Sequence, residues 1–247
     1  MAEFSRYSRQ VVLREVGVNG QQLLRDSSVL IVGLGGLGSV AAAYLAGAGI
    51  GRLCLADRDR VEASNLQRQV LYRQDDIGRA KTQAAQAQLR ALNPEVEVTL
   101  FDDRSWSQAV PQVDVVLDCT DNFPARMAIN AACVQARKPL VSGAAIRFEG
   151  QLALFDLRRG GPCYACLYPD LGDAAETCEE AGILGPVVGA VGAQQALLAL
   201  KLLLGQGGDD AARLHQWDAL RLQWRSHKIT ADPQCPVCAP ATGEPRA

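Results

Sequence analysis

The stretch SVLIVGLGGLG, residues Ser28–Gly38, organises the rest of the chain. An apolar run, Val29–Val32, leads directly into a GxGxxG motif, which predicts a buried strand, a tight turn and a helix over Ser39–Ala48. The glycines permit a sharp reversal, close approach of a ligand to backbone N–H groups and close packing of the helix on the strand. Because free N–H groups at a helix start bind anions, we expect a nucleotide at this turn. The motif glycines are Gly33, Gly35, Gly36 and Gly38.

A second interpretation of the motif is a turn that only packs a helix on a sheet. The context favours a nucleotide site, because a second apolar strand, 52–56, follows the helix and ends at the acidic residue Asp57.

Composition limits the possible classes of protein. The chain has 247 residues, 48% of them hydrophobic, which is enough to bury a large core. The net charge of -2 and the lack of a long basic run argue against binding to nucleic acid or to a membrane surface. The first residues, MAEFSRYSRQ, lack the apolar core of a signal peptide, so we expect a cytoplasmic protein. In that reducing compartment, eight cysteines indicate metal binding or chemistry before disulfides.

Strand-like and helix-like segments alternate along the chain and predict an α/β fold, a Rossmann-like, mostly parallel sheet with flanking helices. We expect a single domain, with a helical N-terminal arm (1–27), a nucleotide-binding core (28–160) and a C-terminal part tethered by zinc (161–247). The apolar run 183–204 is interrupted by polar residues and predicts a buried helix, not a membrane span. The other expected helices are 7–24, 78–92 and 125–136, and the expected strands are 96–101, 113–117, 139–142, 151–156 and an antiparallel pair within 214–229.

Two CxxC pairs, CYAC and CPVC, predict a metal site. Each lies in a turn with proline, and no histidine or carboxylate beside them would leave an open coordination position. Four thiolates suit tetrahedral zinc, so we expect a structural site that clamps the C-terminal part to the body. Unmetallated thiols or a redox pair are the other interpretation. The ligands would be Cys163, Cys166, Cys235 and Cys238.

Acidic residues follow two of the expected strands, and several cations are available to join them. A dinucleotide needs one acid, whereas several acids and cations together suit a triphosphate with Mg²⁺. Solvated surface charges are the alternative for any one of them. The acids are Asp57, Asp59, Asp118 and Asp121, and the cations are Arg9, Arg68 and Lys81.

The remaining cysteines fall into two groups. Cys178 lies in a polar stretch before an apolar helix, where an exposed thiol could be activated, although the two glutamates that follow would tend to raise its pKa. It is either a reactive cysteine or a solvent-facing residue without a role. Cys54, Cys119 and Cys133 fall within apolar patterns and are expected in the core.

The motifs together resemble those of the ThiF/MoeB family, the bacterial relatives of ubiquitin-activating E1 enzymes. The matching segments extend from residue 6 to residue 238 and are RYSRQ, VGLGGLG, LADRDRVEASNLQRQ, GRAKT, LDCTDN, PLVSGAAIRFEGQ, CYAC, TCEEAG and CPVC. The resemblance implies an ATP-dependent adenylyltransferase that activates the C-terminal Gly-Gly carboxylate of a small ubiquitin-fold sulfur-carrier protein. It also implies a homodimer.

The resemblance assigns roles to matching positions. It implies that Arg9 reaches into the ATP site of the other subunit, and that Cys178 takes part in sulfur transfer in some members. The four CxxC cysteines match the zinc ligands of the family. Around ATP and Mg²⁺ it implies Gly36 in the nucleotide loop, Asp57 on the ribose, Asp121 and Asn122 near the metal, and Ser64, Asn65, Leu66, Gln67, Arg68 and Lys81 around the phosphates.

The chemistry of such an enzyme agrees with what the sequence lacks. A glycine carboxylate is ionised at pH 7 and attacks phosphorus directly, so no histidine base or serine nucleophile is required. An NAD-dependent oxidoreductase and a non-catalytic nucleotide-binding member of the family are the alternatives. SGAAIRFEGQ is similar to the molybdopterin branch, whereas LYPD, GPVVG and QWRS are similar to the thiamine branch. No rhodanese domain follows Cys238, so we expect a separate sulfurtransferase or cysteine desulfurase as the sulfur donor.

Overall fold

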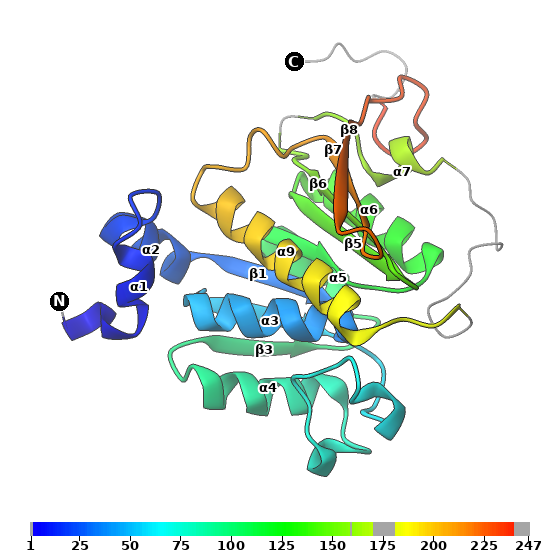
Figure 1. The fold of residues 1–247 in the computed structure, drawn as a ribbon. Helices are drawn as coiled ribbons and strands as arrows, with labels where there is room; N and C mark the ends of the chain where they lie inside the picture. Colours follow the sequence, from blue (N-terminus) through cyan, green and yellow to red (C-terminus); the bar gives the residue numbers. More distant parts are fainter. Residues whose placement is uncertain (1, 159, 170–180, 240–247) are drawn as a thin grey trace.

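The structure, a computed structural model, describes residues 2–158, 160–169 and 181–239, with side chains from residue 5 onward. Within these ranges one eight-stranded sheet forms the centre of the molecule, in the order β3-β2-β1-β4-β5-β6-β7-β8 (Figure 1). The strands are β1 (Ser28–Val32), β2 (Arg52–Ala56), β3 (Glu97–Phe101), β4 (Val115–Asp118), β5 (Leu140–Ile146), β6 (Glu149–Phe155), β7 (Arg213–Asp218) and β8 (Gln223–Lys228).

The first five strands of the sequence are parallel, as the alternation of apolar runs and helices predicted. Val32 at the end of β1 pairs with Ala56 of β2 on one side and with Asp118 of β4 on the other, so the three strands end together. The chain winds toward β3 on one side of β1 and toward β5 on the other. Ligands of open α/β sheets bind at this reversal point, outside the carboxyl ends of the strands.

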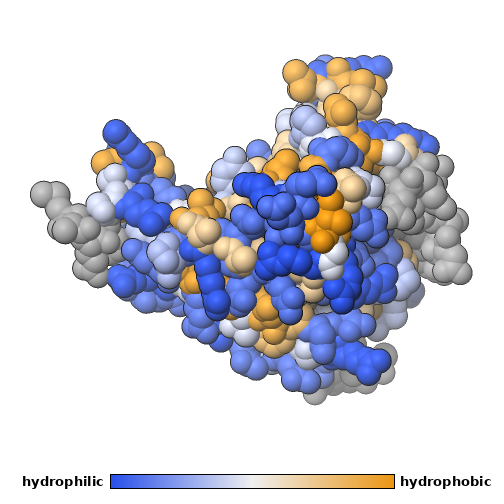
Figure 2. Space-filling model, turned by 90° about the horizontal axis from the view of Figure 1, so that it is seen from below, coloured by the Kyte–Doolittle hydropathy of each residue, from blue (hydrophilic) through white to orange (hydrophobic). Residues whose placement is uncertain are grey.

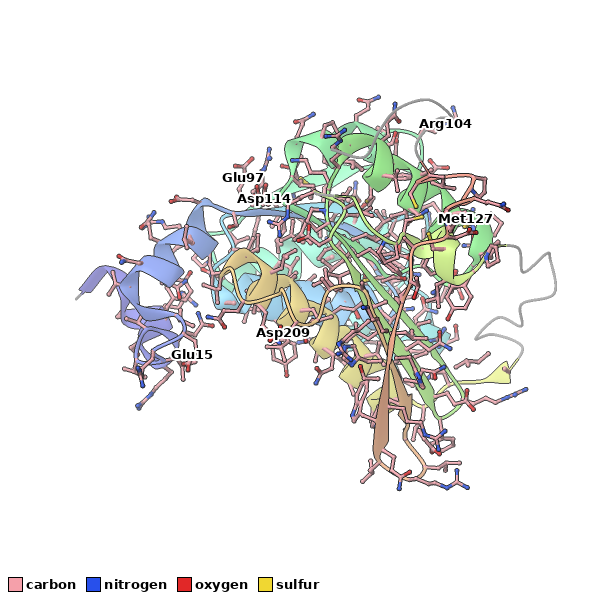
Figure 3. All side chains as sticks on the ribbon, turned by 90° about the horizontal axis from the view of Figure 1, so that it is seen from above. Glu15, Glu97, Arg104, Asp114, Met127 and Asp209 are labelled. Atoms are coloured by element: carbon pink, nitrogen blue, oxygen red, sulfur yellow. The ribbon has the colours of Figure 1, made fainter. Side chains whose placement is uncertain are left out.

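The last four strands form an antiparallel extension. β5 pairs with β6, β6 with β7 and β7 with β8, all antiparallel, which confirms the expected C-terminal hairpin. All six residues of β8 are exposed, because this strand is one edge of the sheet and no helix among the described residues covers it. Figure 3 shows the β7–β8 hairpin, in orange, projecting from the body of the molecule.

Helices cover both faces of the sheet (Figure 1). α3, α4 and α9 contribute to one apolar cluster with one face, and α5, α6 and α7 contribute to a second cluster with the other face. The three remaining cysteines that we expected in the core, Cys54, Cys119 and Cys133, are all buried in these clusters. The helices on the sheet are α3 (Gly36–Ala48), α4 (Lys81–Leu92), α5 (Trp106–Ala109), α6 (Phe123–Ala136), α7 (Tyr164–Leu167) and α9 (Gly185–Leu203); short 3-10 turns are η2 (Ala63–Asn65), η3 (Gln74–Asp76) and η4 (Val110–Gln112).

The glycine turn packs as the motif predicted. α3 begins at Gly36, three residues earlier than expected, so Gly38 lies in its first turn. A Cβ on Gly38 would collide with the carbonyl oxygen of Gly33, and Gly33 itself has a φ of +91°. No other residue type would allow the helix to lie this close to the strand end.

This packing predicts opposite effects for two glycines of α3. Gly38→Ala should lower the free energy of unfolding by about 1–3 kcal/mol, because the added methyl group meets backbone that cannot move aside. Gly47→Ala should raise it by up to about 1 kcal/mol, since Gly47 is exposed with nothing within 4 Å of the added atom and alanine favours the helix. Urea unfolding of both variants measures the difference. Equal effects of the two substitutions would contradict the close packing at Gly38.

The N-terminal arm is helical in three pieces instead of one. η1 (Ala2–Tyr7) and α1 (Ser8–Val11) are separated by a turn from α2 (Gly17–Asp26). The prediction of a continuous helix was wrong, because Gly17 takes a left-handed backbone conformation, with φ +60°, that a regular helix does not contain.

Two side chains of the RYSRQ segment anchor this arm. The hydroxyl of Tyr7, which is 5% exposed, donates to Glu95 Oε2 (3.0 Å) and accepts from Asn93 Nδ2 (2.8 Å). Gln10 Nε2 donates to the Ala48 carbonyl (3.1 Å). These contacts lie at the ends of α3 and α4 and just before the start of β3. The arm therefore lies at the amino edge of the parallel strands.

Figure 3 shows the amino edge and the carboxyl edge of the parallel strands on opposite sides of the molecule. Glu97 and Asp114, at the starts of β3 and β4, lie on the same side of the molecule as Glu15 of the arm. Arg104, which follows β3, and Met127 of α6 lie on the opposite side. The arm and the carboxyl edge are therefore separated by about 20 Å, the length of a helix such as α3.

By length and composition alone, α9 could cross a membrane. Half of its most apolar 18-residue stretch, however, is buried inside the protein. It packs against α3, β5 and β6, as the expected buried helix would. The face in Figure 2 is mostly hydrophilic, with hydrophobic residues in small dispersed groups.

Candidate nucleotide site and cysteine cluster

Asp57 ties the glycine turn to the segment after β2. Its Oδ2 accepts a hydrogen bond from the Leu34 backbone N (2.6 Å), and its Oδ1 accepts one from the Asp59 backbone N (2.7 Å). Burial raises the pKa of Asp57, and the positive charge of Lys81 offsets part of this shift. A carboxylate is therefore held at the carboxyl end of β2, beside the turn where a ligand would lie.

Lys81 lies in the first turn of α4, as predicted, and its side chain is only 7% exposed. Its Nζ donates to Asp59 Oδ2 (2.9 Å), and its backbone N donates to the Asp59 carbonyl (2.9 Å). A buried ammonium group at a helix start opposes the helix dipole and loses hydration, which favours a site that attracts anions.

The polar segment between β2 and α4 folds into a compact turn. Asn65 is buried, and its Oδ1 accepts from the Glu62 backbone N (3.2 Å) in a capping arrangement around η2. Arg68 Nη1 donates to the Ser64 carbonyl (3.0 Å), so the guanidinium lies back along its own segment. Leu66 packs against the core and Gln67 is exposed.

The start of α9 packs closely against the polar segment between β2 and α4. A Cβ on Gly185 would lie 2.5 Å from the Gln67 carbonyl oxygen and 3.5 Å from the Arg68 Cα atom. A Cβ on Gly36 would lie 2.8 Å from the Val188 side chain. The first turn of α9 therefore packs against the polar segment and the glycine turn together.

The acidic segment after β4 contains two aspartates with different environments. Asp118 is 1% exposed, and its carboxylate accepts from the Thr120 hydroxyl (2.7 Å), the Thr120 backbone N (3.0 Å) and the Ser142 hydroxyl (3.1 Å). Asp121 is exposed, with one long bond, at 3.3 Å, from Asn122 Nδ2. Asp118 therefore stabilises the segment, whereas Asp121 presents its carboxylate at the surface.

Asn122 has a structural role that the sequence analysis did not identify. Its Oδ1 accepts from the Ala125 backbone N (3.0 Å) and so caps the start of α6. The expected role beside Mg²⁺ remains a prediction. The cap fixes the backbone directly after Asp121, because a cap satisfies a donor that the helix leaves free.

Two buried polar atoms beside the glycine turn have no hydrogen-bond partner among the described residues: Ser39 Oγ and Gln69 Oε1. Ser39 lies in the first turn of α3, and Gln69 Nε2 lies 3.7 Å from the position of a Cβ on Gly35. No local sequence pattern distinguishes either residue. An unpaired buried polar group is costly, and such groups gather at ligand sites.

The four CxxC cysteines come together as predicted. Their Sγ atoms all lie within 4.8 Å of one another. Cys163 and Cys235 are 3.7 Å apart, and Cys166 and Cys238 are 3.4 Å apart. Tetrahedral zinc with bonds of about 2.3 Å places its sulfurs about 3.8 Å apart, so the cluster fits that ion. The seven cysteines within the described ranges are free thiols.

One predicted residue lies away from the carboxyl edge, and another is not described by the structure. Arg9 is exposed on the arm, at the amino edge, so it does not lie near the glycine turn of its own chain. Cys178 lies outside the described residues.

Comparison with known proteins agrees with this architecture. The model of the ThiF family matches residues 7–237. The chain belongs to the ThiF family. This confirms the family that the sequence motifs indicated.

Two curated members of the ThiF family come from Escherichia coli. The molybdopterin-synthase adenylyltransferase is 45% identical over 96% of this chain and 96% of its own length. The sulfur carrier protein ThiS adenylyltransferase is 47% identical over 98% of each chain. The adenylyltransferase and sulfurtransferase MOCS3 of Drosophila virilis is 44% identical, and this chain spans 54% of it.

Solved structures of the same fold include E. coli MccB. The crystal structure of MccB with ATP superposes with a TM-score of 0.80 at 25% identity, covering 95% of this chain and 74% of MccB. MccB with MccA-N7isoASN gives a TM-score of 0.83, covering 96% of this chain and 75% of MccB. The expected α/β fold, with its mostly parallel sheet and C-terminal antiparallel strands, is thus confirmed.

Proposed function

We propose that this chain is an ATP-dependent adenylyltransferase that activates the C-terminal Gly-Gly carboxylate of a small ubiquitin-fold sulfur carrier. One observation carries the proposal: a glycine turn, a buried lysine and an exposed aspartate share the carboxyl edge of a chain 45–47% identical to two named adenylyltransferases. An NAD-dependent oxidoreductase is not favoured, because hydride transfer has no need of Lys81 or of the acidic segment. A non-catalytic role is not favoured, because the motif positions are filled.

The residues of the site suit nucleotidyl transfer. The carrier carboxylate is already ionised and attacks the α-phosphorus, and pyrophosphate leaves. Catalysis then requires positioning and neutralisation of charge. Lys81 and Arg68 would stabilise the phosphates, Asp57 would hold the ribose, and the backbone N–H groups at the start of α3 would face the nucleotide.

Mg²⁺ is a proposed cofactor. Asp121 fits this ion because it offers an exposed, hard oxygen donor at the carboxyl edge. The carboxylate of Asp118, in contrast, is buried and accepts hydrogen bonds from Thr120 and Ser142. When bound, Mg²⁺ would neutralise charge on the phosphate oxygens.

We propose that the partners are a sulfur carrier, a sulfurtransferase or cysteine desulfurase, and a second copy of this chain. The two E. coli relatives belong to the molybdopterin and ThiS systems, so the carrier comes from one of these classes. A covalent sulfur-transfer role for Cys178 remains a proposal.

Exchange of radiolabelled pyrophosphate into ATP tests the proposed function. Exchange should require the carrier and should disappear when its last two glycines are removed, because the terminal carboxylate is then misplaced. Exchange without any carrier, or reduction of NAD in place of exchange, would contradict the proposal.

We also propose that the cysteine cluster holds structural zinc. Cys235→Ser should release the metal and loosen the C-terminal part, since zinc contributes roughly 10 kcal/mol or more to the folding of zinc-finger peptides. Metal analysis and thermal unfolding measure this, with the core variant Cys133→Ser as a control that keeps the metal. Absence of zinc from protein purified without chelator would contradict the site.

A further inference from the structure

Arg126 is a partly buried cation on α6 that no motif or role has explained. Its Nη2 donates to the Thr120 carbonyl (2.7 Å), directly before Asp121. Burial lowers the pKa of Arg126, but the charge of Asp118 together with the interactions with Tyr164 and Tyr168 raises it by more, so the net shift is upward. The guanidinium is therefore held beneath the acidic segment in its charged form.

The same guanidinium reaches the cysteine cluster through a neighbouring tyrosine. The side chains of Arg126 and Tyr164 line the same small cavity, where the guanidinium and the phenol hydroxyl interact electrostatically. Tyr164 follows Cys163, and its backbone N donates to Asn130 Oδ1 (2.8 Å). The Nδ2 of the same Asn130, which is 0% exposed, donates to Cys163 Sγ (3.4 Å).

Aromatic packing holds Tyr164 in this position. Its ring centroid lies 5.0 Å from that of Tyr168, 6.2 Å from Phe155 and 6.4 Å from Phe123. Phe123 is the first residue of α6, so the ring of Tyr164 also contacts the start of the helix that follows the acidic segment. The tyrosine thus has little freedom to move independently of the cluster or of α6.

We propose that Arg126 is a positioning residue that couples the cysteine cluster to the catalytic acidic segment, Asp118–Asn122. The link consists of Asn130 and Tyr164 on the cluster side and of the Thr120 carbonyl on the catalytic side. The inference rests on the proposed function, in which Asp121 holds Mg²⁺. The cysteine cluster with its metal then stabilises the C-terminal part and also holds Asp121 in place.

Two neighbouring tyrosines provide a matched test. Tyr164→Phe removes the hydroxyl that interacts with Arg126 but keeps the ring. Tyr168→Phe removes a hydroxyl of similar surroundings that donates to Gln151 Oε1 (2.6 Å) instead. Tyr164→Phe should raise the Mg²⁺ concentration for half-maximal pyrophosphate exchange by roughly tenfold, the effect of losing a polar partner of a charged group. Tyr168→Phe should leave it unchanged.

Substitutions of Arg126 extend the test. Arg126→Met should raise the Mg²⁺ requirement by roughly a hundredfold, and Arg126→Lys, which keeps the charge, should recover part of the loss. Zinc content should stay at the wild-type level in all four variants, since none removes a cysteine. If Arg126→Met fails to fold, Tyr164→Phe and Arg126→Lys still decide the result.

Hydrogen–deuterium exchange separates this inference from the proposed function, because it needs neither carrier nor ATP. Amides of residues 118–123 should exchange faster in Tyr164→Phe and in Arg126→Lys than in the wild type and in Tyr168→Phe. Removal of the cluster metal by a chelator should speed the same amides in the wild type. Unchanged exchange and an unchanged Mg²⁺ requirement in both variants would overturn the coupling, even if the enzyme adenylates its carrier.

Discussion

Asp121→Ala is expected to lower the rate of carrier adenylation by roughly 10³-fold or more, the effect of losing several kcal/mol of metal-ion stabilisation. The thermal unfolding temperature should change little, because Asp121 is exposed and its one bond, to Asn122, is long. Loss of activity without loss of stability is the signature of a residue that serves the ligand.

Pyrophosphate exchange and thermal unfolding measure the two quantities. Asp209→Ala is the matched control, since this exposed aspartate lies in the turn after α9, away from the carboxyl edge (Figure 3). Asp118→Ala should instead destabilise the fold, because it leaves the half-buried donor of Thr120 and the buried donor of Ser142 without an acceptor. Near-normal exchange in Asp121→Ala would remove this residue from the mechanism.

Arg9→Ala is expected to lower the adenylation rate by roughly 10²-fold or more, by analogy with arginine fingers in other phosphoryl transfers. Tyr7 and Gln10 fix the arm at the amino edge, about 20 Å from the carboxyl edge of the same chain, so we propose that Arg9 acts in a second copy. A symmetric dimer would exchange two arms and complete two sites.

Mixing of subunits tests the exchange of arms. The Arg9→Ala and Asp121→Ala homodimers should each be nearly inactive, but a mixed dimer has one site with both residues intact. Equal random mixing should restore activity to roughly a quarter of the wild type, since about half of the dimers are mixed and each has one working site of two.

Arg14→Ala is the control for the basic character of the arm, because Arg14 is exposed on the same arm. It should retain normal activity. If subunits demonstrably exchange and the activity of the mixture stays at the level of the separate variants, Arg9 does not act across an interface.

The parallel half of the fold was predictable because each element carries its own local signal. After their first residues, Ser28 and Arg52, β1 and β2 are apolar, as strands buried on both faces must be, and the GxGxxG motif marks the turn that follows β1. The paired CxxC segments were equally informative, because cysteines at that spacing have few other uses. The break before Gly17 was missed, since a left-handed residue leaves no periodic signal in its neighbours.

Much of the site depends on contacts that no local pattern reports. Asp118 and Asp121 are three residues apart in one motif, yet only the pairing of β4 with β5 buries the first beside Ser142. The unpaired carboxamide oxygen of Gln69 and the bond from Arg126 to the Thr120 carbonyl arise from tertiary packing. A charged residue in an amphipathic helix is usually solvated, so the sequence offers no reason to select Arg126.

The central claim is that this chain joins AMP to the terminal carboxylate of a sulfur carrier. Intact-mass spectrometry of the carrier, incubated with this protein, ATP and Mg²⁺, tests it most directly. The account predicts a carrier heavier by one adenylyl group, formed only when the Gly-Gly terminus is present and absent with Asp121→Ala. A carrier of unchanged mass, with the wild-type protein folded and metal-loaded, would contradict it.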